Sequence, residues 1–438
     1  MKTNADNKFG HLNVRRGTFF FHGAFCLWLL CLSAWITGTT GCAVPVRSVT
    51  PGSGANVTMK VSPSQYPGFT DDLNFDGMRF AVEQSLAYLK TLPADRLFHF
   101  GNDTYQTLHL IASLNRFLNF IDQRPSAPEL QTFITSHYHV YRSAGSDGEG
   151  RILFTGYYEP IYRGSRYKTK RFSVPVHARP RDLVSIDLSL FSADFKGRRI
   201  IGRNTGQRIV PYFDRNEIEA SGVLAETADI LAWLEDPVDL FFLQIQGSGK
   251  IYLADGSMLR VHYHTSNGRP YRSIGKRLID TGKISRSNMS MQSIRSYLRE
   301  HPEELRHILN YNPSYVFFKT ETQGPLGCLN VPLTPGRSLA MDRRLFPPAA
   351  LAFIQTRKPL TDADGHIDRW AAFSRFVLNQ DTGGAIRGAG RADLFWGNGP
   401  YAEIAAGHMQ HDGRLFFLVL KPEISQPPGL HASSQNTR

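Results

Sequence analysis

The stretch LNQDTGGAIRGAGRADLFWG, residues 378–397, places two aspartates, Asp381 and Asp393, among closely spaced glycines. In a β-strand, alternate side chains point to the same face. Asp393 would therefore share one face with Arg391 and Phe395, while its immediate neighbours face the opposite side. The glycines remove side chains around it, so that a bulky ligand can approach the backbone. Composition alone leaves two interpretations open, a ligand site or the turn-rich rim of a β-barrel with solvated aspartates.

The triplet Asp-Thr-Gly at Asp381 also carries the catalytic aspartate of aspartic proteases, and a second copy begins at Asp280. A protease needs both aspartates close enough to share one proton, each after a buried strand. Asp280 instead follows residues with helical spacing, and Gly282 has the position of a helix-terminating glycine. The pair Asn379-Gln380 before Asp381 is polar. We therefore predict that the two triplets do not form a protease site.

The N-terminus has the order of a secretory signal, with basic residues before an apolar run at 24–36 (AFCLWLLCLSAWI). The run is short for a membrane-spanning helix. Small residues and then Cys42 follow, which resembles a bacterial lipoprotein signal in which that cysteine is lipidated. We therefore expect residues 1–42 to be a lipoprotein signal peptide with Cys42 as the lipidation site. An uncleaved anchor is the alternative, and it would also face the periplasm.

The chain has 438 residues, enough for two or three domains, and a net charge of +12. Such a charge favours an acidic partner: nucleic acid, an anionic membrane or an acidic polymer. The Lys and Arg residues are scattered and no nucleic-acid motif stands out, so we do not expect nucleic-acid binding. Cys328 is the one cysteine beyond Cys42. We therefore expect no intrachain disulfide, and a buried small residue rather than a nucleophile at Cys328.

Patterning divides the rest of the chain into a tether, a helical start and a long β-rich part. Residues 43–70 are rich in Pro, Ser, Gly and Val, which is typical of a tether. Apolar residues at helical spacing follow, and strand-like segments separated by turns begin at Arg151. Within this part we predict a strand at 240–246, a hairpin around 251–263 and a helical region at 291–309. The pattern favours a mainly β fold, a β-barrel beside a second β-rich region.

Residues 381–407 (DTGGAIRGAGRADLFWGNGPYAEIAAG) resemble the C-terminal domain of the membrane-bound lytic transglycosylase A (MltA) family, a domain named for three aspartates. In this chain the three are Asp342, Asp381 and Asp393. Other segments resemble the same family: FTGYYEP at 154–160, DPVDLFFLQIQGSG at 236–249, NGRPYRSIGK at 267–276, NPSYVFF at 312–318 and GPLGCLNVPLTPGRSLAMD at 324–342. Together they cover most of the chain from about residue 151 to 421.

The resemblance implies a mainly β fold with two barrels. A double-psi β-barrel domain would combine residues 71–160, which include the N-terminal helices, with residues 324–425. The three-aspartate segment would span about residues 335–421 of that domain. A smaller β-barrel domain would be inserted at residues 161–323, and the substrate would lie in a groove between the two domains.

The implied reaction is non-hydrolytic cleavage of the β-1,4 bond between N-acetylmuramic acid and N-acetylglucosamine in peptidoglycan. The 6-hydroxyl of the same muramic acid closes onto C1 and leaves a 1,6-anhydro end. An ordinary glycosidase uses two carboxyl groups, but here the nucleophile belongs to the substrate, so one residue can act as acid and then as base. The resemblance assigns that role to Asp393, whose pKa must then be raised well above about 4. Asp381 and Asp342 would be supporting neighbours.

Substrate contacts follow from the same resemblance and from hydrogen-bonding chemistry. The candidate substrate-binding residues are Thr155, Tyr158, Glu159, Gln244, Gln246, Ser248 and Gly384. Trp396 is a further candidate for stacking on a sugar, with core packing as the equal alternative. His262 and His264 share a strand face that would suit a metal, but no further ligand lies at a suitable spacing. We therefore expect no metal and no cofactor.

The expected partners are peptidoglycan glycan strands, the outer membrane through a lipid on Cys42, and cell-wall synthesis enzymes. The protein would lie at the periplasmic face of the outer membrane of a Gram-negative bacterium. Two other functions stay open, a non-catalytic peptidoglycan-binding barrel and a two-carboxylate glycoside hydrolase. Their products separate the three functions: anhydro ends, no cleavage, or reducing ends.

Overall fold

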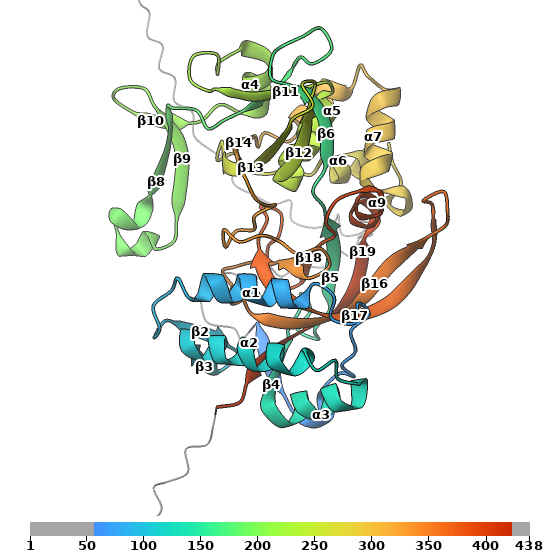
Figure 1. Ribbon diagram of the computed structural model, residues 1–438. Helices are drawn as coiled ribbons and strands as arrows, with labels where there is room; N and C mark the ends of the chain where they lie inside the picture. The colour runs from blue at the N-terminus through green and yellow to red at the C-terminus, as the bar shows by residue number, and fades with distance from the viewer. Residues whose placement is uncertain (1–56, 423–438) are drawn as a thin grey trace, which may run out of the picture. The chain divides into compact units, whose positions relative to one another are not determined.

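Residues 57–422 are described by the computed structural model of the chain (Figure 1). The predicted signal peptide, residues 1–42 with the lipidation site Cys42, lies outside the described residues, as do residues 43–56 of the predicted tether. In the described range, none of the helices is long and apolar enough to cross a membrane.

Eight strands build the larger sheet: β1 (Thr58–Val61), β4 (Tyr138–Ser143), β5 (Ile152–Tyr157), β15 (Ser338–Ala340), β16 (Leu351–Thr361), β17 (Ile367–Asp381), β18 (Arg391–Phe395) and β19 (Gln410–Leu420). Their order is β1-β4-β19-β16-β17-β15-β18-β5, and β19 also pairs with β5. This extra pairing closes six strands, from β19 through β5, into a barrel. The pairs β15–β17 and β18–β5 are parallel, and the other pairs of the barrel are antiparallel.

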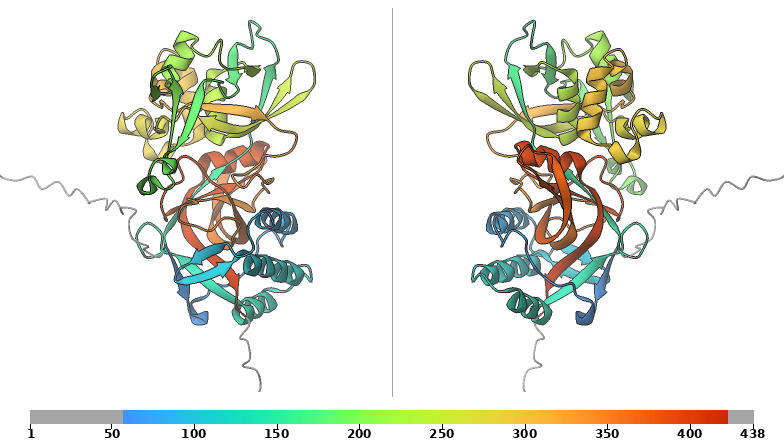
Figure 2. Two further views of the ribbon diagram at one scale, coloured as in Figure 1. Left: turned by 90° about the vertical axis from the view of Figure 1, so that its left-hand side faces the viewer. Right: turned by 90° about the vertical axis from the view of Figure 1, so that its right-hand side faces the viewer.

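Three helices pack beside this barrel: α1 (Met78–Leu89), α2 (Thr107–Ile121) and α3 (Ala127–His137). Figure 2 shows them in blue and teal next to the orange and red barrel strands. The helical spacing predicted α1 and α2 correctly, because their buried residues recur every three or four positions. Phe117 of α2 lies 4.9 Å from Phe376 of β17 between ring centroids. A short hairpin, β2 (Leu97–Phe100) and β3 (Asp103–Gln106), connects α1 to α2.

The segment before α1 belongs to the barrel domain. β1 pairs antiparallel with β4, and Phe69 is buried against barrel aromatic residues. The buried carboxylate of Asp71 accepts two hydrogen bonds, of 2.6 and 2.8 Å, from the guanidinium of Arg337. The tether predicted for residues 43–70 is therefore wrong for residues 58–70. Its polar composition hid the single apolar anchors that hold this segment to the sheet.

The smaller sheet has six strands: β6 (Ile161–Ser165), β7 (Val174–His177), β11 (Ile230–Leu234), β12 (Ser248–Leu253), β13 (Met258–Ser266) and β14 (Val316–Thr320). Their order is β14-β13-β12-β6-β11-β7. A bridge between Ala178 and Phe318 brings the two ends of this order together. The hairpin predicted around 251–263 is β12–β13. The predicted fold class, mainly β with a second, smaller barrel, is confirmed.

The strand predicted at 240–246 is wrong, because these residues form the helix α5 (Pro237–Gln246). Asp236 caps the helix, since its Oδ1 accepts a hydrogen bond of 2.8 Å from the backbone N–H of Val238. Pro237 occupies the first turn, where its missing N–H costs nothing. Gly247 ends the helix with a φ of 81°. These end signals decide the structure of an apolar run whose interior lacks a clear period.

Further short elements belong to the region between β7 and the return to the barrel: α4 (Arg215–Ser221), α6 (Ile274–Asp280), α7 (Met291–Glu300) and α8 (Leu305–Asn310). The helical region predicted at 291–309 is thus two helices, α7 and α8. A three-stranded sheet, β8 (Leu183–Asp187), β9 (Arg199–Asn204) and β10 (Ile209–Pro211), has the order β10-β9-β8. Helix α9 (Pro400–His408) packs on β5, and the Nε2 of Gln292 in α7 donates a hydrogen bond to the carbonyl oxygen of Glu403 in α9.

Candidate active site

Asp381 and Asp393 lie at the same level of the barrel sheet, on the two sides of one strand. Both pair with Ala340 of the short strand β15, which lies between β17 and β18. Residues paired across neighbouring strands point to the same face. Because strands are about 4.8 Å apart, the two aspartate Cα atoms are roughly 10 Å apart with their side chains on one face. The strand β15, which lies between β17 and β18, thus sets the spacing of the two carboxyl groups.

A β-bulge in β17 turns Asp381 toward this face. Ala340 pairs with Asp381 rather than with Gln380, so Gln380 is the extra residue. Its side chain is fully buried, and its Nε2 donates a hydrogen bond of 2.7 Å to the carbonyl oxygen of Ala81 in α1. The polar pair Asn379-Gln380 therefore ends a buried strand, and our inference from its polarity that no buried strand precedes Asp381 is wrong.

The protease interpretation fails on the other triplet. Asp280 is the last residue of α6, is exposed, and pairs with Lys276 at 2.7 Å. Gly282 has a φ of 71°, as expected for a helix-terminating glycine. Asp280 ends an exposed helix whereas Asp381 ends a barrel strand, so the two triplets are not equivalent halves of a protease site.

Asp393 has a partly exposed carboxyl group whose Oδ1 accepts a hydrogen bond from the hydroxyl of Thr155. Thr155 is its partner in the parallel pair of β18 and β5. Burial raises the pKa of Asp393 to about 6, the guanidinium of Arg391 opposes the rise, and the carboxylate of Asp381 adds to it. Arg391 makes no ion pair within residues 57–422; its Nη2 donates instead to the Thr155 hydroxyl at 3.4 Å. Asp393 therefore keeps its proton to a higher pH than an ordinary aspartate does.

Asp381 is held by two donors. The hydroxyl of Tyr157 donates to its Oδ2 at 2.8 Å, and the backbone N–H of Cys328 donates to its Oδ1 at 2.9 Å. Burial raises the pKa of Asp381 to about 6, and these hydrogen bonds limit the rise because they favour the ionised form. Asp381 is thus oriented on both oxygens.

Cys328 is exposed, so the prediction of a buried residue is wrong. Its Sγ nevertheless lies against the barrel, 3.8 Å from the carbonyl oxygen of Gln380. Desolvation and the nearby Asp381 carboxylate raise the pKa of the thiol to about 12. A thiol that stays protonated is a poor nucleophile, which leaves the backbone N–H as the functional group of this residue.

Asp342 lies among hydrogen-bond donors that keep its carboxyl group ionised. Its side chain is buried, and Arg344 donates to both carboxylate oxygens, from Nε at 2.9 Å and from Nη2 at 2.6 Å. The backbone N–H of Gly388 donates to the Oδ2 at 2.9 Å. Burial opposes ionisation of Asp342, but these donors outweigh it and lower the pKa to about 2. Asp342 stays ionised and fixes the loop between β17 and β18, where Gly388 has a φ of 85°.

Three candidate substrate-binding residues are buried among other partners. The Oε2 of Glu159 pairs with the Lys250 ammonium at 3.0 Å, and the Oε1 of Gln244 accepts a hydrogen bond of 2.6 Å from Arg215. Ser248, at the start of β12, is also buried. A sugar would have to displace protein partners to reach these side chains. The structure does not bring Glu159, Gln244 or Ser248 to an open surface beside Asp393.

The remaining candidate substrate-binding residues differ from one another in exposure and in their contacts. Thr155 touches Asp393 and is partly exposed, and Gly384 is exposed, with no heavy atom within 4 Å of the position of an added Cβ. The Oε1 of Gln246 accepts a hydrogen bond of 3.1 Å from the backbone N–H of Tyr158. This bond joins the end of α5 to the end of β5. The Tyr158 side chain is buried, so its ring packs within the protein.

Trp396 is buried and contacts Phe373 and Tyr401 edge-on, with ring centroids 6.3 and 5.9 Å apart. Of the two alternatives for this residue, the structure shows core packing. Ala392 and Leu394, on the same face of β18, are also fully buried. The predicted alternation therefore holds for Ala392, Asp393 and Leu394, whereas Phe395, predicted on the face of Asp393, is buried as well.

Two groups that orient Asp381 escaped the sequence analysis. Tyr157 follows Thr155 by two positions in β5, so strand alternation could have placed it on the same face. The backbone N–H of Cys328 comes from a loop, and no side-chain pattern could reveal it.

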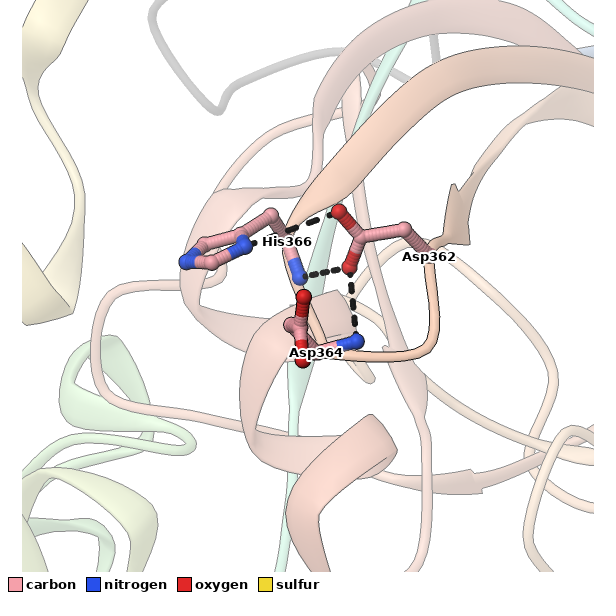
Figure 3. A group of neighbouring side chains, drawn as sticks. All are labelled: Asp362, Asp364 and His366. Carbon is pink, nitrogen blue, oxygen red and sulfur yellow. Dashed lines mark hydrogen bonds and ion pairs between the residues drawn. The ribbon is translucent and has the colours of Figure 1, made fainter.

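One exposed group of potential metal ligands occurs among the described residues: Asp362, Asp364 and His366 at the β16–β17 turn (Figure 3). Asp362 accepts hydrogen bonds from the backbone N–H groups of Asp364 and His366, at 3.1 and 2.8 Å. The carboxylate thus serves the turn itself. His262 and His264 are not part of this group.

Comparisons with known proteins agree on one family. The MltA specific insert domain matches residues 153–319 and the 3D domain matches residues 337–419. Membrane-bound lytic murein transglycosylase A of Escherichia coli (strain K12) is 35% identical over 286 residues, 65% of this chain and 70% of that protein. The crystal structure of a membrane-bound lytic murein transglycosylase from Agrobacterium tumefaciens has a TM-score of 0.66 at 28% identity, covering 83% of this chain and 97% of that one. The E. coli MltA structure with bound chitohexaose has a TM-score of 0.64 at 26% identity, covering 83% and 94%.

Proposed function

The chain belongs to the family of membrane-bound lytic murein transglycosylase A, and we propose that it cleaves peptidoglycan glycan strands with Asp393 as the catalytic acid and base. It is a lytic transglycosylase, an enzyme that breaks the β-1,4 bond between N-acetylmuramic acid and N-acetylglucosamine without water. The chitohexaose bound to the E. coli relative is a β-1,4-linked amino-sugar chain, which supports a glycan substrate.

The observation that carries the assignment is the state of the Asp393 carboxyl group. It is partly exposed, its pKa is raised to about 6, and the neighbouring Arg391 contacts Thr155. With a pKa of about 6, roughly one Asp393 in ten is protonated at pH 7 and half at pH 6. A directly paired guanidinium would have kept the group ionised. The hydroxyl of Thr155 occupies Oδ1, which leaves Oδ2 for the substrate.

The chemistry needs one proton that leaves and returns. Asp393 donates its proton to the glycosidic oxygen as the bond from C1 to that oxygen breaks, and N-acetylglucosamine departs with a hydroxyl group. Positive charge develops at C1 of N-acetylmuramic acid. The 6-hydroxyl of that sugar then attacks C1 and gives its proton to the Asp393 carboxylate. The ring closes, Asp393 is protonated again, and no water is consumed.

Asp381 supports this cycle through its charge. It faces the same side as Asp393, and its carboxylate raises the pKa of Asp393. When ionised it also places negative charge near the positive charge that develops at C1. Tyr157 and the Cys328 N–H hold it in place, so little reorganisation is needed during the reaction.

We assign residues 58–160 and 324–422 to the double-psi barrel domain and residues 161–323 to the inserted domain, with the substrate in a groove between them. Thr155, Gln246 and Gly384 are then the substrate contacts. Four buried residues then stabilise the wall of the groove from inside the protein: Tyr158, Glu159, Gln244 and Ser248.

We propose a location from the N-terminal sequence, and the names of the relatives support it. A lipid on Cys42 would hold the enzyme at the periplasmic face of the outer membrane, next to peptidoglycan. The curated relatives are named membrane-bound. Enzymes of cell-wall synthesis would work on the same polymer and are the expected protein partners.

Product analysis tests the function directly. Purified sacculi are digested with the protein, and the released fragments are separated and weighed by mass spectrometry. We expect anhydro-muropeptides, which are one water lighter than hydrolysed ends. Reducing ends would instead assign a two-carboxylate hydrolase, with Asp381 and Asp393 activating water, and intact sacculi would assign a binding protein.

A further inference from the structure

The three-stranded sheet of the smaller domain ends in an apolar tip that no other part of the described chain covers. We define the arm tip as residues 188–200, which are the connection between β8 and β9 and the first two residues of β9 (Figure 1). Leu190 and Phe191 are 84% and 72% exposed. Phe195 is exposed too. Ile200, near the start of β9, is 47% exposed. Four large exposed apolar side chains in this short stretch mark the projecting end as a candidate binding surface.

The arm tip has regular, hydrogen-bonded local structure. Its two short 3-10 turns, η2 (Leu188–Leu190) and η3 (Ala193–Phe195), are each capped by a side-chain oxygen, from Asp187 and from Ser192. The backbone N–H of Leu188 donates to the carbonyl oxygen of Arg198 at 2.9 Å, which ties the two ends of the tip together. The backbone thus satisfies its own hydrogen bonds while the apolar side chains point outward.

Cations surround the apolar side chains. Lys196, Arg198 and Arg199 are all exposed, and the guanidinium carbon of Arg198 lies 5.3 Å from the Phe195 ring centroid. The carboxylates that face them are Asp194 in η3 and Asp187, which pairs with Arg199 across the strands. Cations therefore outnumber carboxylates at the tip. Exposed apolar side chains with Lys196, Arg198 and Arg199 on the same tip match the acyl boundary and the anionic headgroups of a phospholipid leaflet.

We propose that the arm tip docks on an anionic phospholipid surface, with Leu190 and Phe191 entering the headgroup layer. A sugar polymer fits the tip less well, because residues 188–200 contain no Trp or Tyr, the aromatic residues that combine a stacking face with a hydrogen-bonding group. This contact is separate from the lipid proposed on Cys42 and from the chemistry at Asp393. It would set the distance and orientation of the enzyme relative to the membrane.

Trypsin cleavage reports the contact, because the tip carries its own cleavage sites at Lys196, Arg198 and Arg199. The full-length chain is digested with phosphatidylcholine vesicles or with vesicles containing phosphatidylglycerol, and the cuts are mapped by mass spectrometry. We expect anionic vesicles to slow cleavage at the tip by roughly fivefold or more, since each cation near such a surface adds about that factor in binding. Arg286, exposed in the 3-10 turn η4 (Arg286–Asn288) of the same domain, is the internal control and should be cut at an unchanged rate.

The double variant Leu190→Asp and Phe191→Asp should lose this protection. Both side chains are exposed, so the variant should keep the wild-type melting temperature, and both proteins share the same N-terminus, which cancels any anchoring there. Equal cleavage with neutral and anionic vesicles, or protection that persists in the variant, would overturn the proposal. Protection by soluble glycan strands without vesicles would assign the tip to the substrate and would overturn it as well.

Discussion

Asp381 and Asp393 flank the same residue, Ala340, on the two sides of strand β15. This pairing puts two carboxyl groups on one face of the barrel, at a separation at which the charge of Asp381 changes the proton affinity of Asp393. The carboxylate of Asp381 raises the pKa of Asp393, while Arg391 lowers it. The barrel therefore tunes the acid with one neighbour of each sign.

The pH profile should reveal this tuning. Because Asp393 must be protonated to start the reaction, kcat/KM should fall as the pH rises through about 6. Asp381→Asn removes a neighbouring negative charge, so the pKa of Asp393 should drop and the fall should move to lower pH. Arg391→Gln removes the opposing positive charge, so the fall should move to higher pH. Turnover of soluble glycan strands at a series of pH values measures both shifts.

The two variants form a matched pair, because Asp381→Asn and Arg391→Gln should shift the fall of kcat/KM in opposite directions along the pH axis. General damage to the site would lower the rates of both variants without separating the two pH profiles. Identical profiles for both variants and the wild type would show that Asp393 does not supply the proton.

Tyr157→Phe tests how Asp381 is held. The Tyr157 hydroxyl donates to the Oδ2 of Asp381 and lowers its pKa against the effect of burial. A hydrogen bond to a charged group contributes about 1.5–3 kcal/mol, so its loss should raise the pKa of Asp381 by about one unit or more. Carbon NMR of the labelled carboxyl groups measures this directly. A neighbouring ring, Phe395→Leu, is the control, because it contacts Tyr157 without donating to Asp381. An unchanged Asp381 titration in Tyr157→Phe would refute the role of the hydroxyl.

Sequence patterns predicted those parts of the site that depend on strand period. The alternation of β18 placed Asp393 on the open face and Leu394 in the core, because a strand repeats every two residues whatever its surroundings. The bulge at Gln380 could not be predicted, since it arises from buried hydrogen bonds to α1, far away in the chain.

The polar residues in the segments that resemble the MltA family were harder to interpret. Glu159 and Gln244 have the chemistry of sugar ligands, but their partners Lys250 and Arg215 come from distant elements and bury them. A sequence shows that such a side chain needs a partner, and only the fold shows whether that partner is protein or substrate. The α5 helix was missed for a related reason, because its end signals outweigh an apolar run with no clear period.

Arg344→Ala should destabilise the barrel through Asp342. The Asp342 carboxylate is buried and would lose the cation that helps to lower its pKa to about 2. The loss should be about 1–3 kcal/mol at pH 7, less than for a fully buried pair because Arg344 is largely exposed. The depressed pKa stabilises the fold above about pH 4 and this contribution fades as the pH falls toward 2, so the difference should shrink in acid.

Chemical denaturation of Arg344→Ala at pH 7 and at pH 3 measures the effect. Arg343→Ala is the matched control, since this exposed neighbour makes no ion pair among the residues that the structure describes. Equal stability losses for the two variants at pH 7 would contradict a specific role of the Asp342–Arg344 pair.

Cys42→Ala tests the proposed anchor. Without the thiol no lipid can be attached, so the variant should lose metabolic labelling with a fatty acid and should leave the outer-membrane fraction. Cys328→Ala is the matched control, because its thiol lies in the barrel loop and should not affect fractionation. A Cys42→Ala protein that still fractionates with the outer membrane through high-salt washes would exclude lipidation as the cause of its location.

Asp393→Asn tests the acid itself through two independent readouts. The substitution keeps the shape of the side chain and removes the proton that the leaving oxygen needs, so release of anhydro-muropeptides should fall by at least about 10²–10⁴-fold. The stability should change in the opposite direction. The pKa of Asp393 is raised from 3.8 to about 6, so ionisation costs the folded state up to about 3 kcal/mol at pH 7 and nothing below pH 4. Asp393→Asn should therefore melt at a higher temperature than the wild type at pH 7 and at nearly the same temperature at pH 4. A variant that is inactive because it misfolds would be less stable at both pH values, and near wild-type release of anhydro-muropeptides would move the catalytic role to Asp381.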